Sequence, residues 1–226
     1  CPDAILAWVD GGELKLGPIG EYLPFRERSE ELIRIDCDHL EEALQTGASG
    51  ALTASGTMAV CRRLDIPMAI TCGMGGIGDL RGEELCPDLP ALMNIPVALI
   101  STSPKDMLDR PATLDWLRRH GVHTAGEPCT GYLFCGEPVA LELPLSSCNN
   151  EAAVRRLTAN GGLLLLNPIP EKERVQDRSI LVDAIKAGKQ AEAEGHYYHP
   201  AANGEIDRRT DGYSSRIQLE SIQQNY

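Results

Sequence analysis

The fold is decided by the stretch Thr71–Asp109, which reads TCGMGGIGDLRGEELCPDLPALMNIPVALISTSPKDMLD. A short apolar run, Pro67–Thr71, leads into its glycine-rich turn, and a second apolar run, Val97–Ile100, ends in the polar segment Ser101–Lys105. Continuous apolar runs of this kind are typical of buried parallel strands. Their carboxyl ends open on the same edge of the sheet, where open α/β sheets bind ligands. We therefore expect the chemistry of this protein at that edge.

Three kinds of polar group converge on this edge if both runs are strands: backbone amides of the glycine turn, the carboxylate of Asp88 and the amine of Lys105. The glycine spacing matches a dinucleotide-binding fingerprint, but the segment that should form the following helix is broken by glycine and prolines. A turn that holds a phosphate or allows close backbone packing is therefore favoured over a nucleotide site. The glycines of the turn are Gly73, Gly75, Gly76 and Gly78.

The composition excludes several classes of partner. The 226 residues carry a net charge of -12, so the clustered Lys and Arg that bind nucleic acids or membrane surfaces are not expected. The eight cysteines form no CxxC pair, which favours free thiols and an intracellular, cytoplasmic protein. No apolar run approaches the roughly 20 residues of a membrane span.

The rest of the chain alternates short apolar runs with helical segments. This alternation predicts an α/β fold, with a largely parallel sheet flanked by helices, in a single domain over residues 1–226. Ala4–Val9 is expected as a buried parallel strand with Lys15 on a loop beyond its end, and Tyr132–Pro144 and Gly161–Leu166 as further strands. Helices are expected at Leu40–Gln45 (ended by Gly47), Met58–Leu64, Thr113–His120, Glu151–Leu157, Ser179–Glu194 and Ser214–Asn225.

Two local patterns remain open to more than one interpretation. Ser55 and Thr57 stand at a helix start, where their hydroxyls either bind an anion or cap the helix. His196 and His199 are three residues apart, but no third ligand has the spacing of a zinc site. From Gly195 onward the sequence is polar and interrupted before the terminal helix.

Seven segments in order, GGELKLG, TASGTM, TCGMGGIG, DLPAL, SPKDMLD, TLDWLRRHGV and GGLLLLNPIPE, resemble the pseudouridine-5'-phosphate glycosidases, or indigoidine synthase A-like family. The likeness runs from Ala4 to Asn225. It implies an α/β/α fold, a homotrimer and a divalent cation, typically Mn²⁺. The reaction that it implies is the reversible cleavage of the C–C glycosidic bond of pseudouridine 5'-phosphate to uracil and ribose 5-phosphate. Other relatives form C-glycosidic bonds.

The resemblance also implies roles for individual residues. Lys105 corresponds to the lysine that forms an imine with the sugar, Lys15 to an assisting lysine near the phosphate, and Asp88 to the metal-bound aspartate. Gln218 stands where the family has a catalytic asparagine. The residues that would bind the substrate and its phosphate are Ser55, Thr57, Thr71, Gly73, Gly75, Gly76 and Cys86, the last in place of a serine.

The expected chemistry places a demand on Lys105. A C-glycoside has no lone pair on its leaving atom, so protonation alone cannot expel the base. Opening the sugar to an imine on Lys105 creates an electron sink at C1. The uracil carbon can then leave after it has been protonated. The amine must be partly neutral, so its pKa must be lowered by burial or by a nearby cation such as Lys15.

A second hypothesis is a phosphosugar-binding or regulatory protein that has lost catalysis. It is favoured by Gln218 and by the absence from this sequence of the glutamate segment with which the family begins. An upstream segment that contains this glutamate would count against it. A generic nucleotide-binding domain is a third alternative.

Overall fold

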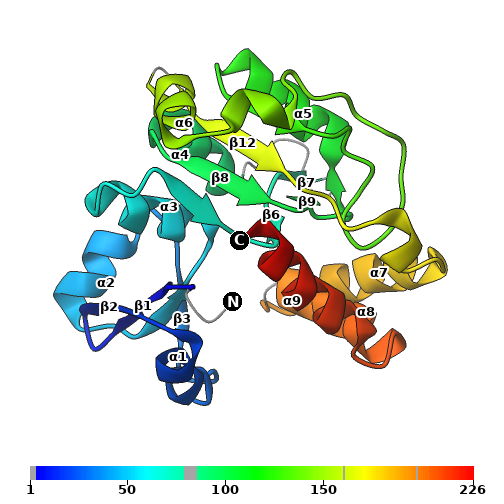
Figure 1. Cartoon of the computed structure of the whole chain (residues 1–226). Helices are drawn as coiled ribbons and strands as arrows, with labels where there is room; N and C mark the ends of the chain where they lie inside the picture. Colours follow the sequence, from blue (N-terminus) through cyan, green and yellow to red (C-terminus); the bar gives the residue numbers. More distant parts are fainter. Residues whose placement is uncertain (1–3, 79–85, 160, 197) are drawn as a thin grey trace.

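Two four-stranded sheets organise the chain, as the computed structural model shows (Figure 1). The structure describes residues 4–78, 86–159, 161–196 and 198–226. The first sheet has the strand order β2-β1-β4-β3 and the second the order β11-β12-β8-β5. The helix α3 (Ala54–Arg63) packs against both sheets, since Val60 enters the core of the first and Met58 that of the second.

The first sheet corrects two expectations about the N-terminal segment. Its strands are β1 (Leu6–Asp10), β2 (Glu13–Gly17), β3 (Ile33–Ile35) and β4 (Gly50–Leu52). The strand β1 exists, but it pairs antiparallel with both β2 and β4, so the prediction of a parallel strand is wrong. Gly11 and Gly12 adopt φ of 60° and 78°, which forms a two-residue hairpin turn. Lys15 therefore lies within β2 and not on a loop.

Short helices connect and cover this sheet. They are α1 (Ile19–Arg26), α2 (Leu40–Thr46) and α3. The prediction for α2 is confirmed, and Gly47 ends it in the left-handed conformation with φ of 74°. The helix α3 begins four residues earlier than predicted because the Thr53 side chain caps it, accepting a hydrogen bond from the Gly56 amide at 3.2 Å.

The second sheet is fully parallel, as the sequence predicts. Its strands are β5 (Met68–Ile70), β8 (Ala98–Ser101), β11 (His123–Gly126) and β12 (Leu163–Leu166). Every residue of β12 is buried because alternate side chains enter different cores. Leu164 and Leu166 join the core that contains residues of α3, α4 (Asp88–Asn94) and α5 (Arg110–Arg119), whereas Leu163 and Leu165 join the core that contains Val154 of α6 (Glu151–Thr158). The α/β/α arrangement is confirmed.

Two small sheets extend the carboxyl edge of the parallel sheet. The strand β6 (Gly73–Met74) pairs parallel with β9 (Ser103–Pro104), and β7 (Ile77–Gly78) pairs antiparallel with β10 (Leu108–Asp109). The glycine turn and the segment that carries Lys105 are thereby joined through backbone hydrogen bonds.

The segment Tyr132–Pro144 is not a strand, which corrects the prediction for it. It takes part only in isolated bridges, such as Cys129 with Val139. The reason is visible at Asp106, whose carboxylate accepts hydrogen bonds from the amides of residues 132, 133 and 134, so these donors are not available to a sheet. The two short 3₁₀ helices are η1 (Leu145–Cys148) and η2 (Glu171–Glu173).

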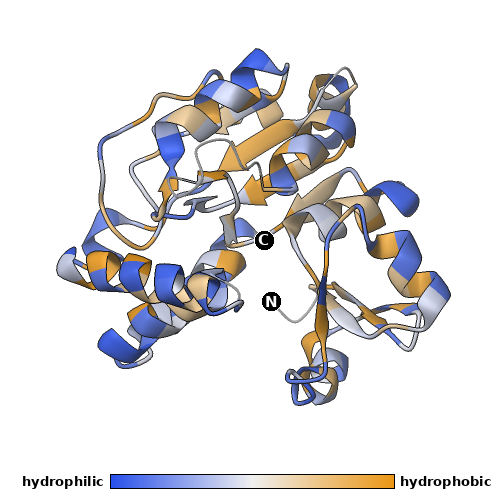
Figure 2. Cartoon of the chain, turned by 180° about the vertical axis from the view of Figure 1, so that it is seen from behind, coloured by the Kyte–Doolittle hydropathy of each residue, from blue (hydrophilic) through white to orange (hydrophobic). Residues whose placement is uncertain are grey.

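Three helices form the C-terminal part of the chain (Figure 1). They are α7 (Ser179–Ala193), α8 (Tyr198–Arg209) and α9 (Tyr213–Asn225), of which sequence analysis misses α8. Gly188 lets α7 approach α8 closely, since a Cβ there would lie 2.5 Å from the Tyr198 ring. Their apolar stripes face the core and their hydrophilic faces point outward (Figure 2). The end of α9 is fixed to the parallel sheet by Asn225, whose Nδ2 donates to the Thr71 carbonyl at 2.9 Å.

Among the described residues, none of the helices is long and apolar enough to span a membrane. The seven cysteines within the described ranges are all free thiols, as expected.

Candidate functional site

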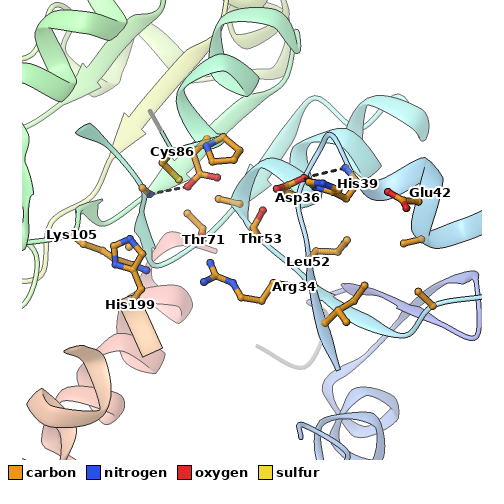
Figure 3. A pocket seen from close by; sticks show the side chains of 18 of the residues that line it. Arg34, Asp36, His39, Glu42, Leu52, Thr53, Thr71, Cys86, Lys105 and His199 are labelled. Carbon is orange, nitrogen blue, oxygen red and sulfur yellow. Dashed lines mark hydrogen bonds and ion pairs between the residues drawn. The ribbon is translucent and has the colours of Figure 1, made fainter. Parts of the chain in front are cut away.

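A cavity of about 600 Å³ opens at the carboxyl edge of the parallel sheet. Residues of the glycine turn, Asp88 and Lys105 line it from the parallel sheet, and residues of β3, α2 and the start of α3 line it from the first sheet. His199 of α8 lines it from the C-terminal helices (Figure 3). The cavity therefore lies where three parts of the fold meet, at the edge that the sequence predicts.

Lys105 follows β9 directly, and its amide donates to the Met74 carbonyl of β6 at 3.2 Å. The side chain is partly buried and lines the cavity. Burial lowers the pKa of Lys105, and the nearby positive charge of Arg34 lowers it further. A lowered pKa increases the fraction of neutral amine, which is the nucleophilic form.

Arg34 supplies the positive charge that the sequence analysis assigned to Lys15. It lies on β3, and its guanidinium points into the cavity toward Lys105 and His199 (Figure 3). No carboxylate forms an ion pair with Arg34 within the described part of the chain. Arg34 is not among the residues predicted from the sequence, because the segment Gly20–Ile35 mixes charged and apolar residues without a clear strand pattern and nothing in it indicates which charge faces inward.

Asp88 connects the two halves of the cavity wall. It is the first residue of α4 and is buried. Its Oδ1 accepts a hydrogen bond from the Ser55 amide at 3.0 Å, and its Oδ2 accepts one from the Gly75 amide at 2.8 Å. The carboxylate thus joins the start of α3 to the glycine turn, with the charge-assisted hydrogen bonds that are the stronger kind.

The glycine turn allows close packing. A Cβ on Gly75 would overlap the Cys86 sulfur and lie 3.0 Å from Asp88 Oδ2, and one on Gly76 would lie 2.5 Å from Thr113 Oγ1. A Cβ on Gly73 would lie 2.8 Å from the Tyr132 ring. The Gly75 amide is already bonded to Asp88, so of the two interpretations left open, close packing accounts for these glycines.

Two further predicted residues line the cavity. Thr71 follows β5 and points its side chain into the cavity (Figure 3). Cys86 is also at the wall, and burial raises the pKa of its thiol to about 12. Cys86 is therefore a neutral thiol at neutral pH and not a nucleophilic thiolate.

Five predicted residues do not line the cavity. Lys15 pairs with Glu13 on the exposed hairpin. The Ser55 hydroxyl bonds to the Thr53 hydroxyl and accepts from the Cys37 amide, and the Thr57 hydroxyl donates to the Thr53 carbonyl. The Gln218 side chain accepts from the Tyr132 hydroxyl at 3.0 Å and donates to the Ser214 carbonyl at 3.1 Å. The fifth residue is Gly76, which packs against Thr113.

The cavity also contains groups that the sequence analysis did not assign to it. His199 is one, and the pair of Asp36 and His39, bonded at 2.7 Å, is another. Asp36 raises the pKa of His39 through this hydrogen bond and its charge. His199 could have been assigned to the cavity only if a helix over Tyr198–Arg209 had been predicted from the sequence.

The side chains around Asp88 decide which kind of cation the cavity could hold. Among the described residues, no three His, Cys, Asp or Glu side chains come together as a metal site. Asp88 offers one carboxylate, in which each oxygen accepts one amide hydrogen bond and retains a further lone pair. This donor set fits a cation such as Mg²⁺ or Mn²⁺, which keeps most of its water ligands, and does not fit a zinc site.

Comparison with known proteins identifies the family. The family described as indigoidine synthase A like protein matches residues 4–226. The chain belongs to this indigoidine synthase A-like family. It is 32% identical over 203 residues to a pseudouridine-5'-phosphate glycosidase of Methylobacterium nodulans, covering 85% of this chain but 59% of that relative. It is 27% identical to the enzyme of the same name from Petrotoga mobilis, covering 98% of this chain and 76% of the relative.

Two solved structures have the same fold as this family member. An indigoidine synthase A-like protein of Thermotoga maritima superposes with a TM-score of 0.80 at 20% identity, covering 98% of this chain and 76% of that one. The prealnumycin C-glycosynthase AlnA, solved in complex with ribulose 5-phosphate, gives 0.76 at 23% identity, covering 95% and 74%.

Proposed function

We propose that this chain is a pseudouridine-5'-phosphate glycosidase-like enzyme that breaks or forms a C–C bond between ribose 5-phosphate and a uracil-like or other carbon partner. The observation that carries the proposal is the partly buried Lys105, with a lowered pKa, in the cavity beside Arg34. The names of the relatives support the substrate class and the type of bond.

In the synthetic direction, the Lys105 amine attacks the aldehyde carbon of the open-chain sugar and releases one water, leaving an iminium at C1. A nucleophilic carbon of the partner then attacks C1, forms the C–C bond and loses its proton. The sugar hydroxyl that closes the ring displaces the lysine amine. Cleavage is the reverse, in which protonation of the partner carbon lets it leave and water hydrolyses the iminium.

Arg34 and Thr71 are the groups best placed to bind the phosphate. A guanidinium can bind phosphate oxygens through two parallel hydrogen bonds. Arg34 lines the cavity and, among the described residues, has no carboxylate partner. These two residues take over the part that the sequence analysis gave to Lys15, Ser55 and Thr57, which lie elsewhere.

Asp88 is the residue that would hold the divalent cation, for which Mn²⁺ remains the prediction. When bound, the cation supplies positive charge and ordered water near the sugar phosphate. Binding is tested apart from activity by titrating Mn²⁺ and following free Mn²⁺ by electron paramagnetic resonance. We expect wild type to deplete free Mn²⁺ and Asp88→Asn to do so less; equal depletion by both would place the ion elsewhere.

One observation favours the alternative of a binding protein without catalysis. Gln218, predicted to be catalytic, uses both ends of its amide on Tyr132 and Ser214 and does not reach the cavity. The alternative shares the phosphosugar site and differs only in whether Lys105 reacts.

The deciding experiment is borohydride trapping with ribose 5-phosphate and Mn²⁺, followed by peptide mass mapping. A reduced sugar adduct on Lys105 supports the enzyme. A chain that binds ribose 5-phosphate by calorimetry but gives no adduct supports the binding protein. The predicted homotrimer is checked on the same sample by light scattering.

A further inference from the structure

His199 lies in the cavity without an assigned role. It is the second residue of α8, and its imidazole is drawn beside the Lys105 side chain (Figure 3). The Tyr198 ring meets the imidazole edge-on, with centroids 5.3 Å apart and an interplanar angle of 86°. This contact, together with the helix, holds the ring at the cavity wall.

The ring nitrogens of His199 have no protein partner among the described residues. Its Nδ1 is buried and makes no hydrogen bond, and no residue of the described ranges bonds to Nε2. Buried polar atoms in native proteins nearly always have a partner, so an imidazole without a protein partner at a cavity wall points to a ligand-binding role.

The charge state of this imidazole is also fixed by its surroundings. Burial, and to a smaller extent the positive charges of Lys105 and Arg34, lower the pKa of His199 to about 4. At neutral pH the ring is therefore uncharged and offers one hydrogen-bond donor and one acceptor. A hydroxyl group can pair with either ring nitrogen, since it donates to the acceptor nitrogen or accepts from the N–H, whereas a phosphate or a carboxylate, which offers acceptors alone, can use only the N–H.

We infer that His199 binds the sugar hydroxyl on C2, next to the carbon that Lys105 attacks, and thereby selects ribose 5-phosphate over 2-deoxyribose 5-phosphate. The inference rests on the proposed function, because it takes Lys105 as the group bonded to C1. Once C1 is bonded to Lys105 Nζ, its own oxygen has left as water. The C2 hydroxyl is then the polar group of the sugar nearest to C1, and the imidazole lies beside the Lys105 side chain that holds C1 (Figure 3).

The test compares the two sugar phosphates in three proteins: wild type, His199→Phe and His196→Phe. The last is a matched control, since His196 is exposed outside the cavity. The readout is the rate of borohydride-trapped adduct on Lys105 at subsaturating sugar, expressed as the ratio of the ribose to the 2-deoxyribose compound. Differences in aldehyde content between the sugars cancel when ratios of different proteins are compared.

We expect the ratio in H199F to fall by about 10- to 100-fold from wild type, because a site built to bond a hydroxyl rejects the analogue that lacks it. The ratio in H196F is expected to equal that of wild type, and His199→Gln, which keeps a donor and an acceptor, to retain most of it. An unchanged ratio in H199F would overturn the inference. If H199F does not fold, as judged by thermal melting, His199→Met gives the same comparison.

Failure of the proposed function is distinguishable from failure of this inference. If wild type gives no Lys105 adduct with either sugar, the imine chemistry is wrong. Calorimetric binding of the two sugar phosphates then still tests His199: loss of the preference in H199F supports the inferred contact, and equal preference in both proteins overturns it.

Discussion

Two lysines follow apolar strands in this chain, and their surroundings differ completely. Lys15 comes after β1 and lies on the β1–β2 hairpin, where it pairs with Glu13 on the surface. Lys105 comes after β8 and lies in the cavity, with a pKa lowered by burial and by the charge of Arg34. In the sequence both look alike, as a lysine shortly beyond a strand.

The difference between these regions originates in the residues after each strand. After β1, Gly11 and Gly12 take positive φ and turn the chain back on itself. After β8, Ser103 and Pro104 continue forward and pair with the glycine turn. A lysine becomes a candidate catalytic group here only when the chain continues past the sheet edge and the amine loses contact with water.

The largest expected effect separates the two lysines. Lys105→Ala should reduce borohydride-trapped adduct by about 10³-fold or more, because the reacting nitrogen is removed. Lys15→Ala should leave trapping and thermal stability unchanged, since its ion pair is exposed to solvent and screened. Equal loss in both variants would mean that the hairpin lysine is part of the reaction after all.

The second prediction compares two aspartates by the free energy of unfolding in urea. Asp88→Ala leaves the Ser55 and Gly75 amides without their acceptor and should cost about 2–5 kcal/mol. Asp10→Ala, on the hairpin, removes a bond to Ser49 and an exposed ion pair with Arg28, and should cost about 1 kcal/mol or less. A small loss in D88A would show that the bridge is dispensable.

The third prediction separates packing from backbone conformation at two glycines. Gly75→Ala should destabilise by about 1–3 kcal/mol, because its methyl group overlaps the Cys86 sulfur. At Gly11, a Cβ would meet nothing within 4 Å, so the only obstacle to a side chain is the positive φ of 60°. Asn tolerates that conformation, so Gly11→Asn should be nearly neutral. The midpoints of thermal unfolding measure both effects, since 1 kcal/mol shifts the midpoint by about 2–4 °C in a protein of this size. An unchanged midpoint in G75A would contradict the packing argument.

The smallest effect concerns two arginines and the pH dependence of trapping. Removing the Arg34 charge raises the pKa of Lys105, so less neutral amine is present at neutral pH. At saturating ribose 5-phosphate, which offsets the loss of the proposed phosphate contact, Arg34→Gln should therefore shift the acid limb of the trapping rate to higher pH, with recovery in alkaline buffer. Arg28→Gln, which changes a surface pair on the hairpin, should leave the limb in place. An unshifted limb in R34Q would remove Arg34 as a cause.

Much of the parallel sheet could be predicted because its signals are local. The apolar runs of β5, β8 and β12 are bounded by turn residues, and α2, α6 and α7 carry clear periodicity and end signals. Errors arose where neighbours decided the outcome. The apolar run at β1 is compatible with parallel and with antiparallel pairing. The amides after Gly131 donate to Asp106 and so cannot join a sheet. The sequence of α8 is polar, and its few apolar residues pack against α7.

The site shows the same division. By itself, the sequence determined the parallel sheet and the edge at which Asp88, Thr71 and Lys105 meet, because strand order along the chain and the turn chemistry after each strand are local properties. Only the tertiary structure decided that Arg34 and His199 face Lys105 while Lys15 and Gln218 do not. These residues come from elements far apart in the chain, and which of their faces points inward depends on packing between those elements, which no local pattern encodes.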